Sequence, residues 1–538
     1  MATGETTDHD VIVIGAGFAG MYLLHRLRDE QGLRVQVYER GSGVGGTWYW
    51  NRYPGARCDV ESKYYSYSFD SELEQEWEWT ERFPAQPELL TYANHVADRF
   101  DLRKNIQFDT SVESAVFDDA TNTWSVTLAD GTTATATYLV TAVGCLSASQ
   151  IPPFDGIDSF SGPTYHTGRW PHEGVDFSGK RVGIIGTGSS GIQAIPVIAE
   201  QAAHLTVFQR TANFSLPSRN RPLKPGEQDE FKADYPSIRA AQRMARGGQP
   251  VADPIGNARE IDPATRAKTM DEAWAAGAVA FMGVFADTML DEDANKVSAE
   301  YVHDRIHDIV KDPATADLLC AKTHPIGTKR ICLDTNYFQT YNRDNVKLVG
   351  IADTPIERIT EKGVQVSGTE YEFDAIVFAT GFDAMTGPLN QIDIRGVDGI
   401  KLKDEWSAGP RTYLGIASAG FPNMFMVTAP GSPSVLTNMI PTIEQHVDWI
   451  TDSIQYNREH GIARIEAKRD EQDQWVQHVN EVAHTTLYPK AASWYMGANI
   501  PGKPRVFMPY IGGLNVYRDI CDDVATDGYR GFTLSPAA

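Results

Sequence analysis

Two glycine loops, each directly after a short apolar run, constrain the fold of this chain more than any other feature of its sequence. They lie in "VIVIGAGFAG" (11–20) and in "RVGIIGTGSSG" (181–191), and both have the spacing Gly-x-Gly-x-x-Gly. A segment with helical character follows each loop. This order is typical of a parallel strand, a tight turn and a helix whose N-terminus binds the pyrophosphate of a dinucleotide.

The chain repeats a longer unit around each loop. In the first copy, residues 123–144 predict a hairpin with its turn at 130–131, leading into a strand that ends at the last glycine. In the second copy, residues 363–381 predict the same shape with the turn at 367–368. We therefore predict the α/β class, with two Rossmann-like dinucleotide-binding domains.

The residue that ends the second strand of each unit distinguishes the two nucleotide sites. Glu39 ends that strand in the first unit, and a carboxylate there accepts hydrogen bonds from the ribose of FAD or NAD. Arg210 ends it in the second, where a guanidinium suits the 2′-phosphate of NADP. Two nucleotides in one chain imply hydride transfer between them. The residues of the two units predicted to bind nucleotide are Gly15, Gly17, Gly20, Glu39, Gly186, Thr187, Gly188, Ser189, Ser190, Arg210 and Thr211.

The second copy is longer than the first, and this difference sets the predicted domain boundaries. Its extra residues lie between Arg210 and Asn342, are rich in alanine and charged residues, and have helical periodicity, so we predict a helical insertion in the second domain. The chain after Gly381 is expected to pack back onto the first domain. The predicted segments are 1–147 and 381–538 for the FAD domain, 148–225 and 335–380 for the NADP domain, and 226–334 for the insertion.

Composition narrows the class of protein and of ligand. A chain of 538 residues is too long for one hydrophobic core, and its net charge of -23 disfavours nucleic acid or an anionic membrane as a partner. Its five cysteines contain no CxxC pair and no metal-ligand spacing, so we expect buried thiols in a reducing compartment and no metal. The most apolar run, 274–286, is shorter than a membrane span of about 20 residues, which leaves a buried helix or a pocket wall. The N-terminal residues are polar and acidic, unlike a signal or transit peptide, and we predict a cytoplasmic protein.

Two further motifs carry a resemblance to a known family. "GGTWYWNRYPGARCD" (45–59) and "FSGPTYHTGRWP" (160–171) resemble the two fingerprints of type I Baeyer–Villiger monooxygenases, which are class B flavoprotein monooxygenases. The second motif matches Phe-x-Gly-x-x-x-His-x-x-x-Trp-Pro at every fixed position. "ATGFD" (379–383) and "ASWYMGANIPGKP" (492–504) fit as well. The resemblance extends over nearly the whole chain and is nearest to phenylacetone, steroid and cyclic ketone monooxygenases.

The resemblance implies both the reaction and the residues that carry it. NADPH reduces FAD, O2 adds to the reduced flavin, and the resulting C4a-peroxyflavin attacks a ketone to give an ester or a lactone. Arg330 matches the active-site arginine that stabilises the peroxide anion, and Asp59 matches the carboxylate that orients it. Lys329 and Arg210 match the residues that select the 2′-phosphate, and Trp494 matches a tryptophan near NADP and substrate.

Other residues of the matched motifs receive roles in the cofactor site, the substrate pocket and the link between domains. Gly46, Thr47 and Trp48 are expected to contact the cofactor. The predicted flavin wall is Tyr49, Trp50, Tyr53 and Arg57, and the predicted pocket for a small hydrophobic ketone is Ser434, Val435 and Leu436. His166 is expected to hydrogen-bond across the junction of the two domains and Trp170 to anchor it, although a purely structural role for this histidine fits equally.

Alternatives remain open from the sequence. A flavin monooxygenase that oxidises sulfur or nitrogen would share the fold, but Trp170 and Asp59 weigh against it. A dinucleotide-binding sensor without turnover is the second alternative, and a disulfide reductase is disfavoured because no CxxxxC follows the first unit. We expect O2 and a ketone as small-molecule partners, and a monomer or a dimer.

Overall fold

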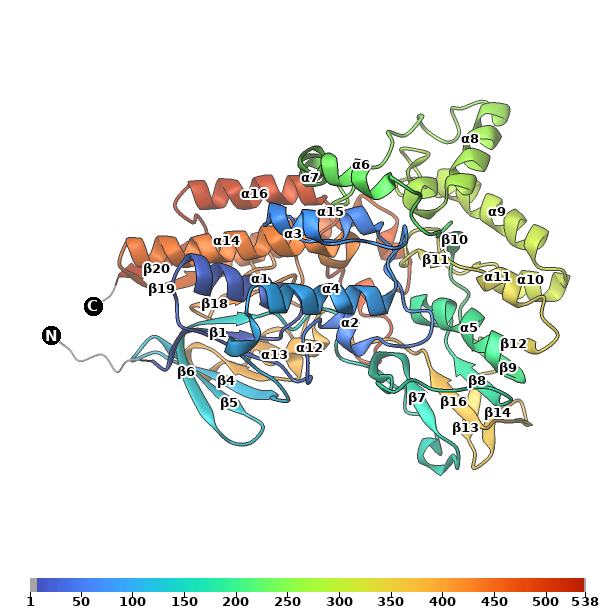
Figure 1. The fold of residues 1–538 in the computed structure, drawn as a ribbon, viewed down its shortest axis with the longest axis horizontal. Coiled ribbons are helices and arrows are strands. Elements are labelled where there is room, and N and C mark those ends of the chain that lie inside the picture. The colour runs from blue at the N-terminus through green and yellow to red at the C-terminus, as the bar shows by residue number, and fades with distance from the viewer. Residues whose placement is uncertain (1–6, 537–538) are drawn as a thin grey trace.

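Two sheets, at the left and right of Figure 1, organise the molecule, and a computed structural model describes its residues 7–536. The first sheet has the strand order β17-β4-β5-β6-β1-β2-β3, and β18 also pairs with β6. Its strands are β1 His9–Ile14, β2 Val35–Tyr38, β3 Ile106–Gln107, β4 Val112–Asp118, β5 Thr123–Leu128, β6 Thr133–Thr141, β17 Asp393–Arg395 and β18 Met424–Met426. Because β1 pairs in parallel with both β2 and β6, the predicted first unit is confirmed.

The second sheet is parallel throughout and has the order β12-β9-β8-β16-β7. Its strands are β7 Thr164–His166, β8 Arg181–Ile185, β9 His204–Gln209, β12 Val346–Gly350 and β16 Ala375–Phe378. The predicted second hairpin is a separate antiparallel sheet of β13 Ile356–Ile359, β14 Gly363–Val366 and β15 Thr369–Glu372. The predicted continuous strand is divided into β15 and β16. At the division, the Phe373 N–H donates to the carbonyl of Lys362 and the Asp374 N–H donates to the carbonyl of Arg181.

The closing strands end earlier than the sequence suggested. β6 ends at Thr141 and β16 at Phe378, whereas we predicted Gly144 and Gly381. The next residues, Ala142 and Ala379, still donate their N–H groups to the last residue of the first strand of each unit. Their carbonyl groups, however, lie against the first glycine of each glycine loop. The chain must bend there to pass the loop, so the strand cannot continue.

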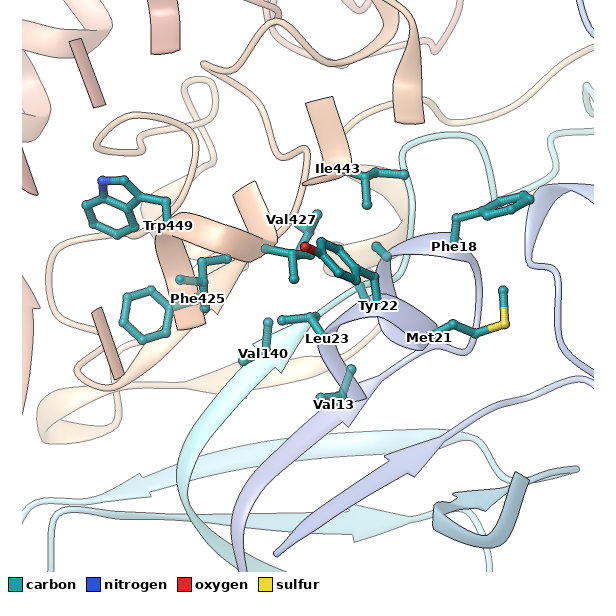
Figure 2. Close-up of a cluster of buried hydrophobic side chains, with 14 of the residues drawn as sticks. Val13, Phe18, Met21, Tyr22, Leu23, Val140, Phe425, Val427, Ile443 and Trp449 are labelled. Atoms are coloured by element: carbon teal, nitrogen blue, oxygen red, sulfur yellow. The ribbon is translucent and has the colours of Figure 1, made fainter. Parts of the chain in front are cut away.

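Helices follow both glycine loops and cover the sheets. α1 Phe18–Leu24 continues as a π-helical turn through Glu30, and α5 Ser189–Gln201 follows the second loop. The C-terminal part returns to the first sheet through β17, β18 and α14 Met439–Glu459, which packs on α1, so the predicted return is confirmed. Figure 2 shows this shared core, in which Val13 and Leu23 of the first unit and Val427 and Ile443 of the C-terminal part belong to one cluster of buried side chains.

The insertion is helical, as predicted. Its helices are α6 Glu227–Ala233, α7 Tyr235–Met244, α8 Pro263–Ala276, α9 Glu292–Ile309 and α10 Pro313–Leu319. Two short parallel strands, β10 Ser215–Pro217 and β11 Cys332–Asp334, join it to the second domain. Of the apolar run 274–286, Phe281 and Phe285 are buried in the core of that domain, so this run packs there.

Shorter and C-terminal elements complete the fold. They are α2 Thr47–Trp50, α3 Ser71–Glu76, α4 Gln86–Arg99, α11 Tyr337–Thr340, α12 Gly387–Asn390, α13 Leu402–Glu405, α15 Arg469–His484, α16 Leu514–Thr526, β19 Ile462–Ala467 and β20 Phe532–Pro536.

All five cysteines are buried and free. Among residues 7–536, no helix combines the length and the apolar character needed to cross a membrane. The extreme N-terminal residues 1–6, part of the segment judged unlike a signal peptide, lie outside the described residues.

Candidate functional site

One cleft of about 970 Å³ runs between the two glycine loops. It is lined by the larger part of the residues that the sequence singled out: Gly15, Gly17, Glu39, Gly46, Thr47, Trp48, Asp59, Gly186, Thr187, Gly188, Ser189, Ser190, Arg210, Thr211, Lys329, Arg330, Val435 and Trp494. These residues come from segments more than 400 positions apart in the chain. The fold therefore brings both predicted nucleotide sites and the predicted catalytic pair to one space.

The first glycine of each loop has a backbone that other residues rarely adopt. Gly15 has φ of 104° and Gly186 has φ of 112°. A Cβ atom on Gly15 would lie 2.6 Å from the carbonyl oxygen of Ala142, and one on Gly186 would overlap the carbonyl oxygen of Ala379. Gly20 does not line the cleft; a Cβ there would overlap the carbonyl of Gly15, so its part is the close packing of helix on loop.

Glu39 lies buried at the end of β2, where it stabilises the glycine loop. One carboxylate oxygen accepts the N–H of Ala16 at 2.7 Å, and the other accepts the N–H of Gly41 at 2.7 Å. Burial raises the pKa of Glu39, while these two N–H groups act in the opposite direction. Each oxygen keeps a second lone pair, so the carboxylate can still accept a ribose hydroxyl in the cleft.

Arg330 and Asp59 form an ion pair in the cleft. Arg330 donates from Nε and Nη2 to Oδ2 of Asp59, at 3.1 and 2.6 Å, and from Nη1 to the carbonyl of Val435 at 2.7 Å. The two side chains are 34% and 27% exposed. The charge of Asp59 raises the pKa of Arg330 beyond its already high normal value. Arg330 is therefore a permanent cation, held at three points.

Lys329 and Arg210 form a second positive region at the opposite nucleotide site. Burial, and then the charge of Arg210, lower the pKa of Lys329. In the part of the chain that the structure describes, neither side chain forms an ion pair with a carboxylate. Two neighbouring cations without an acidic partner favour a bound anion such as a phosphate.

The first fingerprint contacts the second domain through a residue that sequence reasoning missed. Gln193 of α5 accepts from the Tyr53 hydroxyl at 2.8 Å and donates to the carbonyl of Arg57 at 3.0 Å. A Cβ atom on Gly55 would overlap the carbonyl of Gln193, so this glycine permits the close approach. The one available signal was a polar side chain on the otherwise apolar face of the helix after the second loop.

The second fingerprint is not a free linker. Residues 164–166 form β7, which pairs in parallel with β16 at the edge of the second sheet. His166 Nδ1 accepts from the Gly168 N–H at 2.9 Å, and Nε2 lies 3.3 Å from the carbonyl of Gln150. The His166 ring packs against Phe382 of the predicted segment 381–538, whereas these two hydrogen bonds stay within the predicted segment 148–225 of the second domain. The expected hydrogen bond across the junction stays a prediction. Trp170 is buried in that domain's core, and neither side chain lines the cleft.

Burial lowers the pKa of His166 to about 4. The imidazole is consequently neutral at physiological pH, with Nδ1 as the acceptor and its proton on Nε2, toward Gln150. This arrangement fits the structural role that the sequence left open.

Three other predicted positions do not reach the cleft. The Ser434 side chain is fully buried and donates to the Thr428 carbonyl at 3.1 Å. Leu436 packs on the apolar cluster that also contains Val435, but only Val435 of that predicted pocket lines the cleft. Tyr49 bonds to Ser42 instead of forming the flavin wall, whereas Trp50, Tyr53 and Arg57 do line the cleft. Neighbouring residues on a short helical turn point in different directions, which the sequence order does not reveal.

Three polar atoms in the cleft wall lack partners within residues 7–536. They are Oδ1 of Asn213, Oγ of Ser493 and Oδ1 of Asn499, all buried. Asn499 also donates to the Phe382 carbonyl at 2.7 Å, and Lys503 pairs with Asp383 at 2.6 Å, so two of the matched motifs are joined. Buried polar atoms ordinarily have partners, so these atoms mark places where a bound ligand can satisfy them.

Comparisons with known proteins agree with this geometry. The family model described as flavin-binding monooxygenase-like matches residues 8–221. A Baeyer-Villiger monooxygenase from Pseudooceanicola batsensis is 45% identical over 97% of this chain and 95% of its own length. An acetone monooxygenase (methyl acetate-forming) from Gordonia sp. is 43% identical over 99% and 100%. A phenazine N-monooxygenase from Lysobacter antibioticus is 42% identical over 99% and 98%. The solved structure of an oxidized steroid monooxygenase bound to NADP is 51% identical, with a TM-score of 0.94, and covers 98% of this chain and 100% of its own.

Proposed function

This chain belongs to the Baeyer–Villiger monooxygenases, and from this premise we propose that Arg330 and Asp59 are the catalytic pair of its oxygen-inserting site. The enzyme uses FAD and NADPH and converts a ketone to an ester or a lactone. The observation that carries the proposal is the three-point fixation of the Arg330 guanidinium in the cleft that both glycine loops line.

The residues of the cleft fit the two cofactors. We propose that FAD is held by the first glycine loop, Glu39 and residues 46–48, and NADP by the second loop with the residues Arg210, Thr211, Lys329 and Trp494. The glycines leave room for phosphates, and the unpaired cations suit a 2′-phosphate. When bound, NADPH and FAD supply the electrons and the oxygen-activating chemistry.

Arg330 supplies fixed positive charge where negative charge develops on oxygen. A guanidinium has five N–H donors, and the structure engages three of them, with Asp59 and Val435. One N–H on Nη1 and one on Nη2 remain for an oxyanion in the cleft. Because the pKa of Arg330 is raised, the charge does not depend on pH, and because Asp59 fixes the plane, the donors need no rearrangement during the reaction.

The test replaces the pair one member at a time in the FAD-loaded enzyme. Arg330→Ala should lower the rate of ester formation by about 100- to 1000-fold, the range for loss of a preorganised oxyanion donor, while FAD stays bound. Asp59→Asn should lower it less, because the cation remains but loses its orientation. Arg259→Ala, at an exposed position outside the cleft, is the control. An Arg330→Ala enzyme that forms ester at a rate within a few-fold of the parent would refute the assignment.

We further propose a small hydrophobic ketone as substrate, with Val435 as part of its pocket. The relatives named for acetone, cyclohexanone and cyclopentanone support a ketone. Supplying aryl, cyclic and steroid ketones with NADPH in air tests this, with an ester one oxygen heavier as the expected product. A sensor without turnover is not favoured, because relatives along the full chain are named as monooxygenases. One of these relatives is named for oxidation of nitrogen, but more of them are named for Baeyer–Villiger reactions or for ketones, which favours a ketone over a sulfur or nitrogen substrate.

The remaining proposals concern organisation and location. We propose the five-segment domain division given above, a monomer or a dimer, and a cytoplasmic enzyme, which its five free, buried cysteines support. His166 and Trp170 then act in coupling only indirectly, by fixing the edge strand β7 and its turn. Sedimentation equilibrium measures the oligomeric state.

A further inference from the structure

A second cavity, of about 320 Å³, lies between α1, α7, α14 and α16. Its lining shares no residue with the nucleotide cleft. In Figure 1, α7 and α16 lie next to each other above α14, and α16 contacts both helices. None of the roles proposed above uses the polar side chains that line this cavity.

The acidic side chains of the cavity already have donors. Glu444 accepts the backbone N–H and the hydroxyl of Ser68 at 2.5 and 2.7 Å. Asp448 accepts the hydroxyl of Tyr22 at 2.7 Å. Burial raises the pKa of Glu444, while the two hydrogen bonds from Ser68 act in the opposite direction.

One of the three arginines in the lining is also satisfied. Arg239 pairs with Glu74 at 2.6 Å, with both side chains less than a tenth exposed, and it donates to the hydroxyl oxygen of Ser66 at 2.7 Å. The Ser66 hydroxyl thus accepts, and its own hydrogen stays available.

The other two arginines have no such partners. Among residues 7–536, neither Arg243 nor Arg518 has a carboxylate within ion-pair distance, and Nε of Arg518 is buried with no acceptor. Burial lowers the pKa of Arg518, and the charge of Arg243 acts in the same direction, whereas the charges of the neighbouring acids, Asp522 first, act against it. Acids lie near both guanidinium groups but form no direct ion pair with them within residues 7–536, so both groups keep N–H donors for a ligand in the cavity.

We propose that this cavity binds a small oxyanion, a phosphate or a carboxylate, through the guanidinium groups of Arg243 and Arg518 and the hydroxyl of Ser66. Guanidinium forks match the planar or tetrahedral oxygens of such groups, and the orphaned Nε gains its acceptor. The nearby acids weaken the attraction, so binding in the millimolar range is expected. The cavity is separate from the nucleotide cleft, so the ligand is not a substrate of the oxygenation.

The experiment measures binding of inorganic phosphate and, in a parallel arm, of malonate to the FAD-loaded enzyme by calorimetry. NADP⁺ is present at saturation, so that Arg210 and Lys329 do not bind the probe. A chloride solution of the same ionic strength as the probe solution is the control. Arg243→Gln should raise the Kd about tenfold or more, the factor for one lost charge-assisted hydrogen bond. Arg518→Gln should do the same, and Arg259→Gln, at an exposed arginine elsewhere, should leave the Kd unchanged.

Binding of either probe that weakens in Arg243→Gln but not in Arg259→Gln supports the site, and the stronger arm identifies its preferred anion. Arg243 is exposed, so its variant tests the proposal even if Arg518→Gln fails to fold. Absence of saturable binding for both probes, or binding that Arg243→Gln leaves intact, overturns the proposal. Neither outcome bears on the catalytic pair, which is tested by ester formation.

Discussion

Lys329 and Arg330 are consecutive basic residues of the cleft, but the nearest charge is positive for Lys329 and negative for Arg330. Arg330 is fixed by Asp59, and this neighbour raises its pKa. Lys329 has Arg210 as its charged neighbour, and burial together with that like charge lowers its pKa. The first cation is therefore constant with pH, while the second loses its proton more readily than a free lysine.

The Lys329 site predicts a pH dependence of NADPH affinity. A protonated lysine attracts the 2′-phosphate, so affinity is fully present below the lowered pKa of Lys329 and falls as pH rises through it. The KM for NADPH should rise between neutral and alkaline pH. Lys329→Gln should raise KM about tenfold or more at neutral pH and remove the dependence, whereas Lys329→Arg should keep KM low throughout. A parent KM that stays constant over this interval would contradict the prediction.

Two glycines of the loops predict different failures when changed to alanine. Gly15→Ala puts a Cβ 2.6 Å from the Ala142 carbonyl at φ of 104°, so we expect the variant to lose FAD or to fold poorly. Gly188 has φ of -82°, and a Cβ there meets no atom within 4 Å. Gly188→Ala should therefore fold and hold FAD but bind NADPH more weakly, because the methyl group occupies cofactor space. Flavin absorbance and NADPH titration of both variants check this, and equal FAD loss in the two would be inconsistent with it.

At the scale of elements, the loop between α2 and Asp59 serves both domains. Its first part lines the FAD side of the cleft, and Tyr53 and Arg57 hydrogen-bond to Gln193 of α5, the helix after the NADP loop. Asp59, two residues further on, pairs with Arg330. The hydrogen bonds of this loop therefore connect α5 to the segment that carries Asp59, the residue we propose to orient Arg330.

Gln193 is expected to act as a positioning residue. Gln193→Ala removes both hydrogen bonds and leaves the buried Tyr53 hydroxyl without its acceptor. The free energy of unfolding should fall by about 1–3 kcal/mol. The variant should bind FAD normally but form several-fold less ester per NADPH oxidised. Gln193→Glu retains the acceptor for Tyr53 and loses the donor to Arg57. Its ester yield per NADPH oxidised should lie between those of the parent and Gln193→Ala. Unchanged ester yield per NADPH in Gln193→Ala would exclude this role.

At the scale of the whole molecule, a buried histidine joins the long C-terminal helices to the first sheet. His446 of α14 accepts the Thr428 N–H at Nδ1, 3.0 Å, and its Nε2 lies 2.9 Å from the hydroxyl of Tyr517 on α16, which in turn donates to the Leu414 carbonyl at 2.5 Å. These partners fit a neutral ring with its proton on Nε2. Burial lowers the pKa of His446 to about 3.

This network predicts loss of stability in acid. The folded pKa of His446 lies below its unfolded value of about 6.5, so between these values the unfolded chain binds a proton that the folded chain does not. The free energy of unfolding should fall by about 3 kcal/mol as pH drops from about 6.5 to about 4. Denaturant unfolding across this range should show a flatter pH slope in His446→Gln, which is less stable at neutral pH. An equal slope in both proteins would contradict the assignment.

Much of the fold and the cofactor class could be predicted from the sequence. The glycine loops, the strands before them, and the residues Glu39 and Arg210 at the next strand ends are local features, and local backbone conformation and burial follow directly from local residue types. The family resemblance added Arg330 and Asp59 as partners, which no spacing could show because they lie 271 positions apart.

Only the tertiary structure decided which side chains meet. It placed Gln193 against the first fingerprint, directed Ser434 and Tyr49 away from the cleft, and made the second fingerprint an edge strand whose histidine bonds within its own domain. It also gathered Arg243 and Arg518 from distant helices around one cavity. The sequence by itself determined the two nucleotide-binding units, because their geometry is encoded within a few residues. The pairings between units depend on how whole elements pack, and packing is set by contacts far apart in the chain.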